Sequence, residues 1–184
     1  LNVYSPSPGA FDKDEVKILD RLASNLAVAV KGIKNKQEKE KTAYQLNERV
    51  KEIKTIYEVS SLLKEEELEF TEILSDVVNK LPNGLQFPDN CGALICFNDA
   101  CYQSALYKSS EFSMRSVKKA DDGKLLQIEM VYLTETPHEH EGPFLKEERD
   151  LLDNVTELLI TFYNKRIIRQ KLKTSEANLN SVFE

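Results

Sequence analysis

Apolar residues recur three and four positions apart near the start of the chain, which predicts an amphipathic helix beginning near Asp12. Acidic residues at that point suit the first turn of a helix. Residues 34–41 then contain no apolar side chain, but no Pro or Gly interrupts them, so we expect the helix to continue through this solvated segment. The apolar stripe before it comprises Leu19, Leu22, Ala23, Leu26, Ala27, Val30 and Ile33.

A second stripe follows the charged segment, with the three–four alternation of a coiled-coil seam. Its members are Ala43, Leu46, Val50, Ile53, Tyr57 and Ser60. The earlier seam of Leu26, Val30 and Ile33, continued at the same spacing, misses the later one by one residue. Such slips locally unwind or overwind a coiled coil. Two interpretations stay open: a plain amphipathic linker, or a signalling helix whose seam shifts between two registers.

The rest of the chain shows a helical pattern, four short strand patterns and a final helical pattern. This order predicts an α+β domain, with helices on one face of a four-strand antiparallel sheet. A break is expected between Lys64 and Glu69. A helix over 70–80 should end at Leu81-Pro82-Asn83-Gly84. The expected strands are 91–98, 101–107, 112–118 and 125–133, with turns at Asn98-Asp99 and Asp121-Asp122-Gly123, and the closing helix runs from 147 to about 169.

The chain also contains a repeat at an offset of 133 residues. Each copy holds a short strand, a Pro-bearing loop and a helix that begins after a Phe, which points to tandem modules. The first copy is cut, so its strand at residues 1–5 has no native neighbours here and is expected to be disordered or paired with another molecule. Matching positions are Phe11 and Phe144, Leu19 and Leu152, and Leu26 and Leu159.

Composition narrows the function classes. The net charge of −6 argues against nucleic acid as a partner, because phosphate binding needs a basic surface. A basic cluster near the C-terminus is interpreted as a solvated helix end. Its members are Lys165, Arg166, Arg169, Lys171 and Lys173. No run approaches the roughly 20 apolar residues of a membrane span, and no signal peptide is expected.

Three cysteines, Cys91, Cys96 and Cys101, lie close together and are odd in number. A disulfide is therefore not expected, and a reducing cytosol is the natural compartment. Cys96 should lie in the middle of a strand as a small buried hydrophobe.

Candidate chemistry is sparse. His138 and His140, with Glu139 and Glu141, could bind a metal, but no cysteine or third histidine completes the set and a surface loop is favoured. No phosphate-binding loop, dinucleotide motif or Ser-His-Asp set is visible. No catalytic residue, cofactor or metal is assigned, so the fragment is not expected to be an enzyme.

The best-defined motif is Glu141-Gly142-Pro143-Phe144. Gly142 allows an unusual backbone angle, Pro143 is expected to start the closing helix, and Phe144 should anchor the loop on the core. Glu147, Glu148 and Asp150 are then expected in the first helical turn, where the dipole stabilises them.

These motifs resemble known sensor modules. Residues 1–33 resemble the last strand and helix of a GAF domain. Residues 46–166 resemble a small GAF-like module of bacterial sensor histidine kinases, and 175–184 resemble the entry to a PAS domain. The resemblance rests on Glu48-Arg49-Val50-Lys51-Glu52-Ile53, Tyr57-Glu58-Val59-Ser60, Leu81-Pro82-Asn83-Gly84-Leu85-Gln86-Phe87-Pro88 and Glu141 to Arg149. Leu85 departs from it, since an aromatic residue is usual there.

The resemblance implies a multidomain sensor whose kinase lies outside this sequence. The implied division is a truncated GAF domain at 1–33, a coiled-coil linker at 34–64, a GAF-like domain at 65–168, and a linker helix with the start of a PAS domain at 169–184. The implied function is a cytoplasmic, non-catalytic signal relay, with the alternative of a small-molecule-binding GAF sensor. Its partners would be a second copy through parallel helices and the adjacent GAF, PAS and kinase domains, with no membrane contact.

Overall fold

Helical apolar spacing on both sides of the charged segment, and the absence of proline between residues 13 and 62, produce one long helix, α1 (Lys13–Leu62). It continues through the charged segment 34–41, as predicted. The computed structural model describes residues 4, 11–64, 68–137 and 139–182, with side chains up to 178. The strand predicted at residues 1–5 lies outside the described residues, apart from Tyr4.

The chain divides into two units, Leu1–Leu46 and Asn47–Glu184, which are described separately. The division falls inside the segment 34–64 that the sequence predicts as a linker. Residues 47–62 of α1 therefore belong to the same unit as the sheet.

The second unit is α+β, as predicted. After α1 come α2 (Phe70–Lys80), two short 3-10 helices, η1 (Leu81–Gly84) and η2 (Pro88–Asn90), and then the four strands and the closing helix. The helix predicted over 70–80 has these bounds, and η1 contains the predicted stop at Pro82 and Gly84. The remaining elements are β1 (Cys91–Phe97), β2 (Ala100–Gln103), β3 (Ser113–Lys119), β4 (Leu125–Tyr132) and α3 (Lys146–Val182).

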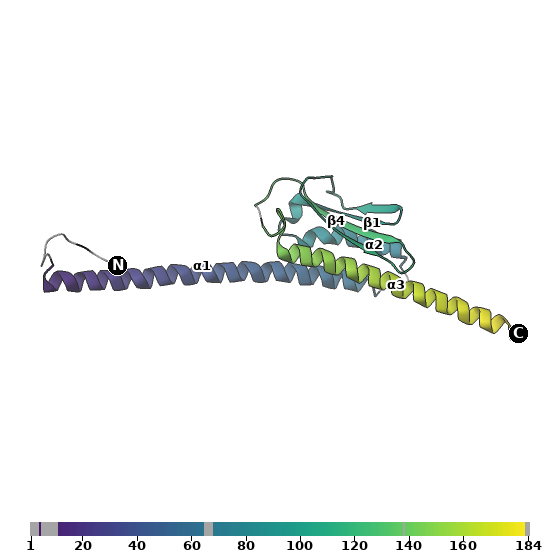
Figure 1. Ribbon diagram of the computed structural model, residues 1–184, viewed down its shortest axis with the longest axis horizontal. Coiled ribbons are helices and arrows are strands. Elements are labelled where there is room, and N and C mark those ends of the chain that lie inside the picture. The colour runs from purple at the N-terminus through teal and green to yellow at the C-terminus, as the bar shows by residue number, and fades with distance from the viewer. Residues whose placement is uncertain (1–3, 5–10, 65–67, 138, 183–184) are drawn as a thin grey trace. The chain divides into compact units, whose positions relative to one another are not determined.

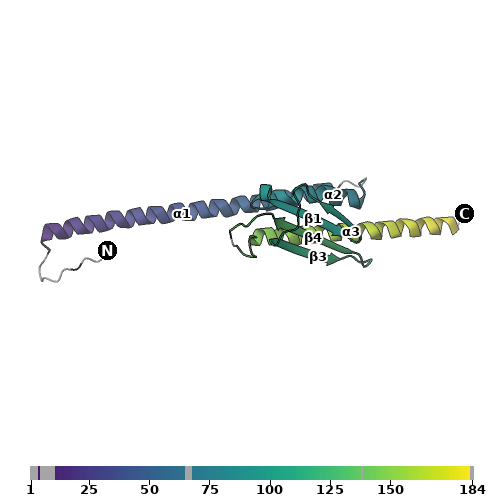
Figure 2. The ribbon, with the colours of Figure 1, turned by 90° about the horizontal axis from the view of Figure 1, so that it is seen from above.

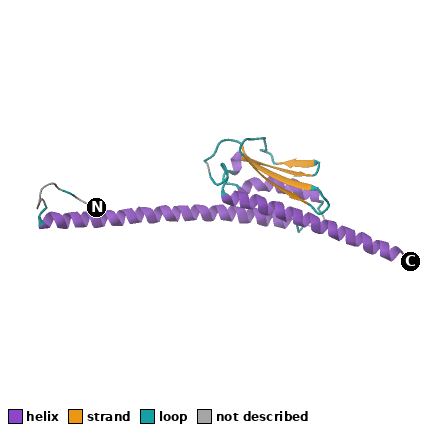
Figure 3. Ribbon diagram, in the orientation of Figure 1, coloured by secondary structure: helices purple, strands orange, loops and turns teal. Residues whose placement is uncertain are grey.

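The sheet has the strand order β2-β1-β4-β3, and all neighbouring strands are antiparallel. Helices α2 and α3 cover the same face of this sheet (Figures 1 and 3). Figure 2, seen from above, shows β1, β4 and β3 side by side over α3. Both predicted turns form, with positive φ angles at Asn98 and Gly123.

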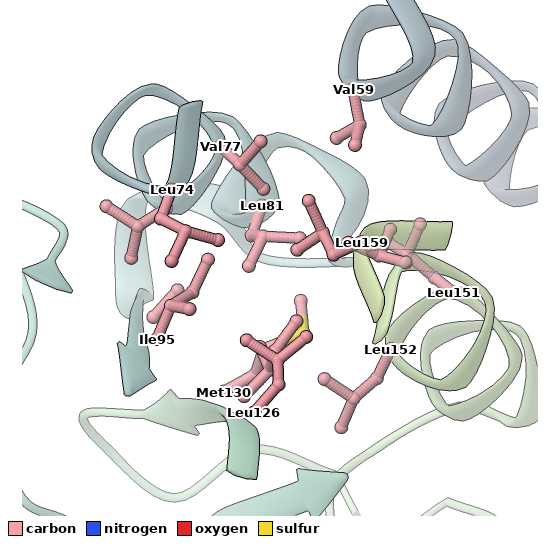
Figure 4. Close-up of a cluster of buried hydrophobic side chains, with 14 of the residues drawn as sticks. Val59, Leu74, Val77, Leu81, Ile95, Leu126, Met130, Leu151, Leu152 and Leu159 are labelled. Atoms are coloured by element: carbon pink, nitrogen blue, oxygen red, sulfur yellow. The ribbon is translucent and has the colours of Figure 1, made fainter. Parts of the chain in front are cut away.

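The hydrophobic core lies between the sheet and the helices (Figure 4). Alternate residues of β1 and β4 point into it, because successive side chains of a strand face opposite sides. Residues 47–62 of α1 also contribute, through Val59, which is fully buried. The central members are Val59, Leu74, Val77, Leu81, Ile95, Leu126, Met130, Leu151, Leu152 and Leu159.

The second strand is shorter than predicted and ends at Gln103 instead of 107. The Ser104 hydroxyl accepts a hydrogen bond from the Ala93 amide at 2.9 Å, and the chain then turns across β1. Gly92 permits this crossing, since a Cβ at that position would lie 2.5 Å from Tyr107 Cα. Strand β2 therefore ends where the Ser104 hydroxyl, instead of a backbone carbonyl, accepts the hydrogen bond of the Ala93 amide.

The closing helix is longer than predicted and reaches Val182. The segment 146–182 contains no Gly or Pro, so nothing in it stops a helix. The PAS entry predicted at 175–184 is helical as far as Val182.

The prediction that no disulfide forms is wrong. Cys96 and Cys101 are joined by a disulfide, with their Cα atoms 4.1 Å apart. The two-residue turn at Asn98-Asp99 makes them direct partners in the β1–β2 register. Cys96 is accordingly half-buried and bonded, not a buried free thiol, whereas Cys91 is free and buried.

Candidate functional site

The Glu141–Phe144 motif forms a tight turn against the core. The backbone groups of Glu141 and Phe144 bond each other in both directions, at 3.0 and 3.1 Å, and Gly142 has φ 61°. The Phe144 ring stacks on Tyr132 with centroids 4.9 Å apart. Pro143 lies inside this turn, three residues before α3, so it does not start the helix as predicted.

Arg149 of α3 binds the Glu141–Phe144 turn on its solvent side. Its guanidinium pairs with the Glu141 carboxylate and donates to the Arg115 carbonyl at 2.8 Å. The hydrogen bond and charge of Arg149 lower the pKa of Glu141. The motif thereby ties α3 to strand β3 and to its own loop.

Glu148, at the start of α3, is the centre of a buried polar cluster. It is 2% exposed. Its carboxylate accepts hydrogen bonds from the Gln86 amide at 2.6 Å, the Tyr132 hydroxyl at 2.5 Å and the Leu145 amide at 2.7 Å. One side chain therefore joins α3 to strand β4 and to the loop after η1.

The environment of Glu148 shifts its pKa above the ordinary carboxyl value. Burial raises its pKa, and the charge of Glu48 acts in the same direction, while the three hydrogen bonds oppose the shift. Burial also raises the pKa of Tyr132, with Glu148 as the next cause, so that hydroxyl remains a donor.

Two further carboxylates are buried on the side of α1 that faces the domain, and one of them, Glu48, is linked to Gln86. Glu48 is 4% exposed and accepts bonds at 2.9 and 3.3 Å from Lys51, whose ammonium lies 3.4 Å from the Gln86 carbonyl oxygen. Glu52 is buried and pairs with Arg49 at 2.8 Å. Gln86 is thus linked to α1 through its carbonyl and to α3 through its amide.

Gly84 allows α1 and α3 to approach each other here. A Cβ at this position would lie 2.3 Å from a Leu151 methyl carbon and 3.0 Å from the Thr55 hydroxyl oxygen. We call the contacts of Glu48, Lys51, Gly84, Gln86, Tyr132 and Glu148 the helix junction. Sequence reasoning placed Glu148 only in a helical first turn and missed the burial of Glu48, because buried carboxylates leave no mark in a hydrophobic pattern.

The predicted seam residues lie on solvent-facing surfaces of α1. Residues 48, 52, 55 and 59 face the domain, and the seam positions two residues earlier point about 200° away around the helix. The seam residues that belong to the second unit are Val50, Ile53 and Tyr57, which lie two residues before the buried positions 52, 55 and 59. All seven seam residues are 51–68% exposed: Leu26, Val30, Ile33, Leu46, Val50, Ile53 and Tyr57.

Of the two histidines predicted as metal candidates, only His140 is described. His138 lies outside the described residues, and His140 is exposed in the loop before Gly142. Among the described residues, no group of three or more His, Cys, Asp or Glu side chains is placed to hold a metal ion.

The basic cluster partly lines a groove between the end of α1 and α3. The apolar residues that line it are Leu63 and Phe162. Arg166 is engaged there, since its guanidinium donates to the Leu68 carbonyl at 2.5 Å and pairs with Glu69 at 3.2 Å. This pairing ties the connection before α2 to the outgoing helix.

No described helix combines the length and the hydrophobicity that crossing a bilayer requires. The chain matches no protein-family model, no curated protein and no solved structure. The GAF-like and PAS-like resemblances therefore stay predictions.

Proposed function

We propose that this chain is a non-catalytic relay segment of a bacterial two-component sensor. Two copies associate in parallel through the seam of α1, and a conformational change in the incoming helix passes through the α+β domain to α3. The parent protein would be a cytoplasmic histidine kinase, with neighbouring GAF, PAS and kinase domains before and after this segment.

The observation that carries the proposal is the division of α1 between two faces. From residue 47 onward, three of the four buried positions, Glu48, Glu52 and Thr55, are polar, while the apolar Val50, Ile53 and Tyr57 stay exposed. A monomer would gain by the opposite arrangement, because burying apolar surface stabilises a fold by about 25 cal/mol per Å². The exposed heptad spacing fits a second helix of the same kind.

The helix junction supplies the coupling. Gln86 and Gly84 lie between α1 and α3, so a rotation of α1 would move contacts of Glu48 and Thr55 and then those of Glu148 and Leu151. A relay needs two close-lying states that the input biases. The phase slip across 34–41 is where we place the change of register.

Sedimentation equilibrium tests the association. Val30→Lys and Ile53→Lys place a charge in the seam and should weaken dimerisation at least tenfold, or about 1.4 kcal/mol. The matched control is Val28→Lys, since Val28 is equally apolar and 73% exposed but lies two residues off the seam. If Val28→Lys and Val30→Lys raised the dissociation constant of the dimer equally, the dimer interface would not follow the predicted seam.

The alternative, a small-molecule GAF sensor, would hold its ligand between sheet and loops. A thermal-shift screen separates the two functions, because a ligand that binds only the folded state raises the melting temperature. A reproducible shift with one ligand class would favour the sensor.

A further inference from the structure

The Cys96–Cys101 pair occupies an edge of the sheet. Cys96 lies on β1 and Cys101 on β2, the outermost strand on that side. Each cysteine stands the same number of residues from the Asn98-Asp99 turn. The two sulfurs would therefore stay opposite each other after reduction, as long as the hairpin keeps its register.

The disulfide is open to small reagents. Cys101 is exposed and Cys96 is half-buried. Ala93, Ile95 and Phe97 point into the core, so Cys96 points to the face of β1 away from the helices. Exposed disulfides are the labile ones, whereas structural ones are shielded from exchange.

The third cysteine, Cys91, is separated from this pair. Cys91 is buried on the core side of β1, where its thiol donates to the Pro88 carbonyl at 3.3 Å. Burial, followed by the charges of Glu148 and Asp89, raises the pKa of Cys91 to about 12. It stays protonated and cannot exchange with the pair.

The disulfide is not the only link between β1 and β2. The two cysteines are five residues apart in sequence, so the disulfide closes a very short loop and removes less chain entropy from the unfolded state than a disulfide across a long loop would. The strands are also held by the antiparallel pairing of Leu94–Phe97 with Ala100–Gln103. Both redox states can therefore share one structure.

We propose that Cys96 and Cys101 form a reversible thiol–disulfide site that exchanges with low-molecular-weight thiols. This goes beyond the relay function and does not depend on it.

The exchange balances with two thiols, RSH. The thiolate of the first attacks Cys101 Sγ, the S–S bond breaks, and Cys96 leaves as a thiolate that takes up a proton. A second thiolate attacks the R sulfur of the mixed disulfide, which releases Cys101 and forms RSSR. The protein disulfide is reduced by two electrons, two thiols are oxidised, and the reverse sequence restores the bond.

Glutathione is the probe for this site. The full chain is equilibrated at a series of reduced-to-oxidised glutathione ratios, treated directly with excess N-ethylmaleimide at neutral pH, which blocks every accessible thiol and stops the exchange, and weighed by intact mass spectrometry. We expect two labels to appear together in one transition, with unchanged circular dichroism, and to disappear when oxidised glutathione is added back. Cys91 should take a label only in urea.

Two variants sharpen the test. Cys91→Ala should leave the two-label transition in place, and Cys96→Ser with Cys101→Ser should abolish labelling of the folded chain. A disulfide that resists dithiothreitol until the chain unfolds would overturn the proposal, as would a pair that never forms in oxidised glutathione. A persistent mixed disulfide with glutathione would also overturn it.

Discussion

Replacing Glu148 tests the helix junction most sharply, because one side chain serves three buried donors. In Glu148→Ala the amides of Gln86 and Leu145 and the Tyr132 hydroxyl lose their acceptor. A buried donor left without a partner costs about 1–3 kcal/mol. Removing a carboxylate whose own burial is unfavourable offsets part of this loss, so we expect a destabilisation of about 3 kcal/mol.

Glu148→Gln separates hydrogen bonding from charge. The amide keeps one acceptor oxygen for Gln86 and Tyr132 but turns an NH₂ group toward the Leu145 amide. The expected destabilisation at pH 7 is about 1 kcal/mol, since one bond is lost and a buried charge is removed. The matched control is Glu157→Gln, an exposed salt-bridge residue on the same helix, which should change stability by less than about 0.5 kcal/mol.

The pH dependence has a definite sign. The pKa of Glu148 is higher in the folded state than its ordinary value, so the folded chain binds the extra proton. The stabilisation that comes from this raised pKa is fully present below the pKa of Glu148 in the unfolded chain. It is lost as the pH rises through the pKa of Glu148 in the folded chain. The stability of wild type relative to Glu148→Gln should therefore fall as pH rises from the ordinary carboxyl range.

Urea unfolding followed by far-UV circular dichroism at fixed protein concentration measures these differences. A shift in midpoint with an unchanged slope reports a change in stability. A Glu148→Ala variant within 0.5 kcal/mol of wild type would refute the three-donor account. A wild-type advantage that grows with pH would refute the assigned direction of the pKa.

Three other predictions concern α1 and its contacts. Gln37→Leu with Glu40→Leu fills the interrupted seam and should tighten dimerisation at least tenfold by sedimentation, whereas an unchanged dissociation constant would show that the seam avoids these positions. Gly84→Ala should destabilise the chain by about 1–3 kcal/mol in urea, because its Cβ would overlap Leu151 and Thr55. A Cβ at Gly32 would meet nothing within 4 Å, and Gly32 lies inside a helix, so Gly32→Ala should stabilise the chain by about 0.5–1 kcal/mol. A Gly84→Ala variant that is more stable than Gly32→Ala would contradict the close packing described around Gly84.

Local signals made the elements predictable. The apolar spacing over 70–80 and the following Pro82 and Gly84 define α2 and its end without any tertiary information. The α+β class and both turns followed in the same way. The end of β2 did not, because it depends on Ser104 reaching a distant amide and on Gly92 making room for Tyr107.

The candidate site was only partly visible. The Glu141–Phe144 turn was predicted because Gly142 and Pro143 mark it locally. The burial of Glu48 and Glu148 runs against their polarity and arises from packing between helices far apart in sequence. The cysteine pairing was missed, although the predicted turn at Asn98-Asp99 already placed Cys96 opposite Cys101.

Cysteine cross-linking tests the parallel seam most directly. In a parallel, in-register dimer, Ile53→Cys places two thiols face to face, while Lys54→Cys places them apart. The test is made in a Cys96→Ser, Cys101→Ser background, in which the remaining native cysteine, Cys91, is buried. The account predicts rapid covalent dimers from Ile53→Cys on mild oxidation and few from Lys54→Cys; equal yields from both, or none from Ile53→Cys, would contradict it.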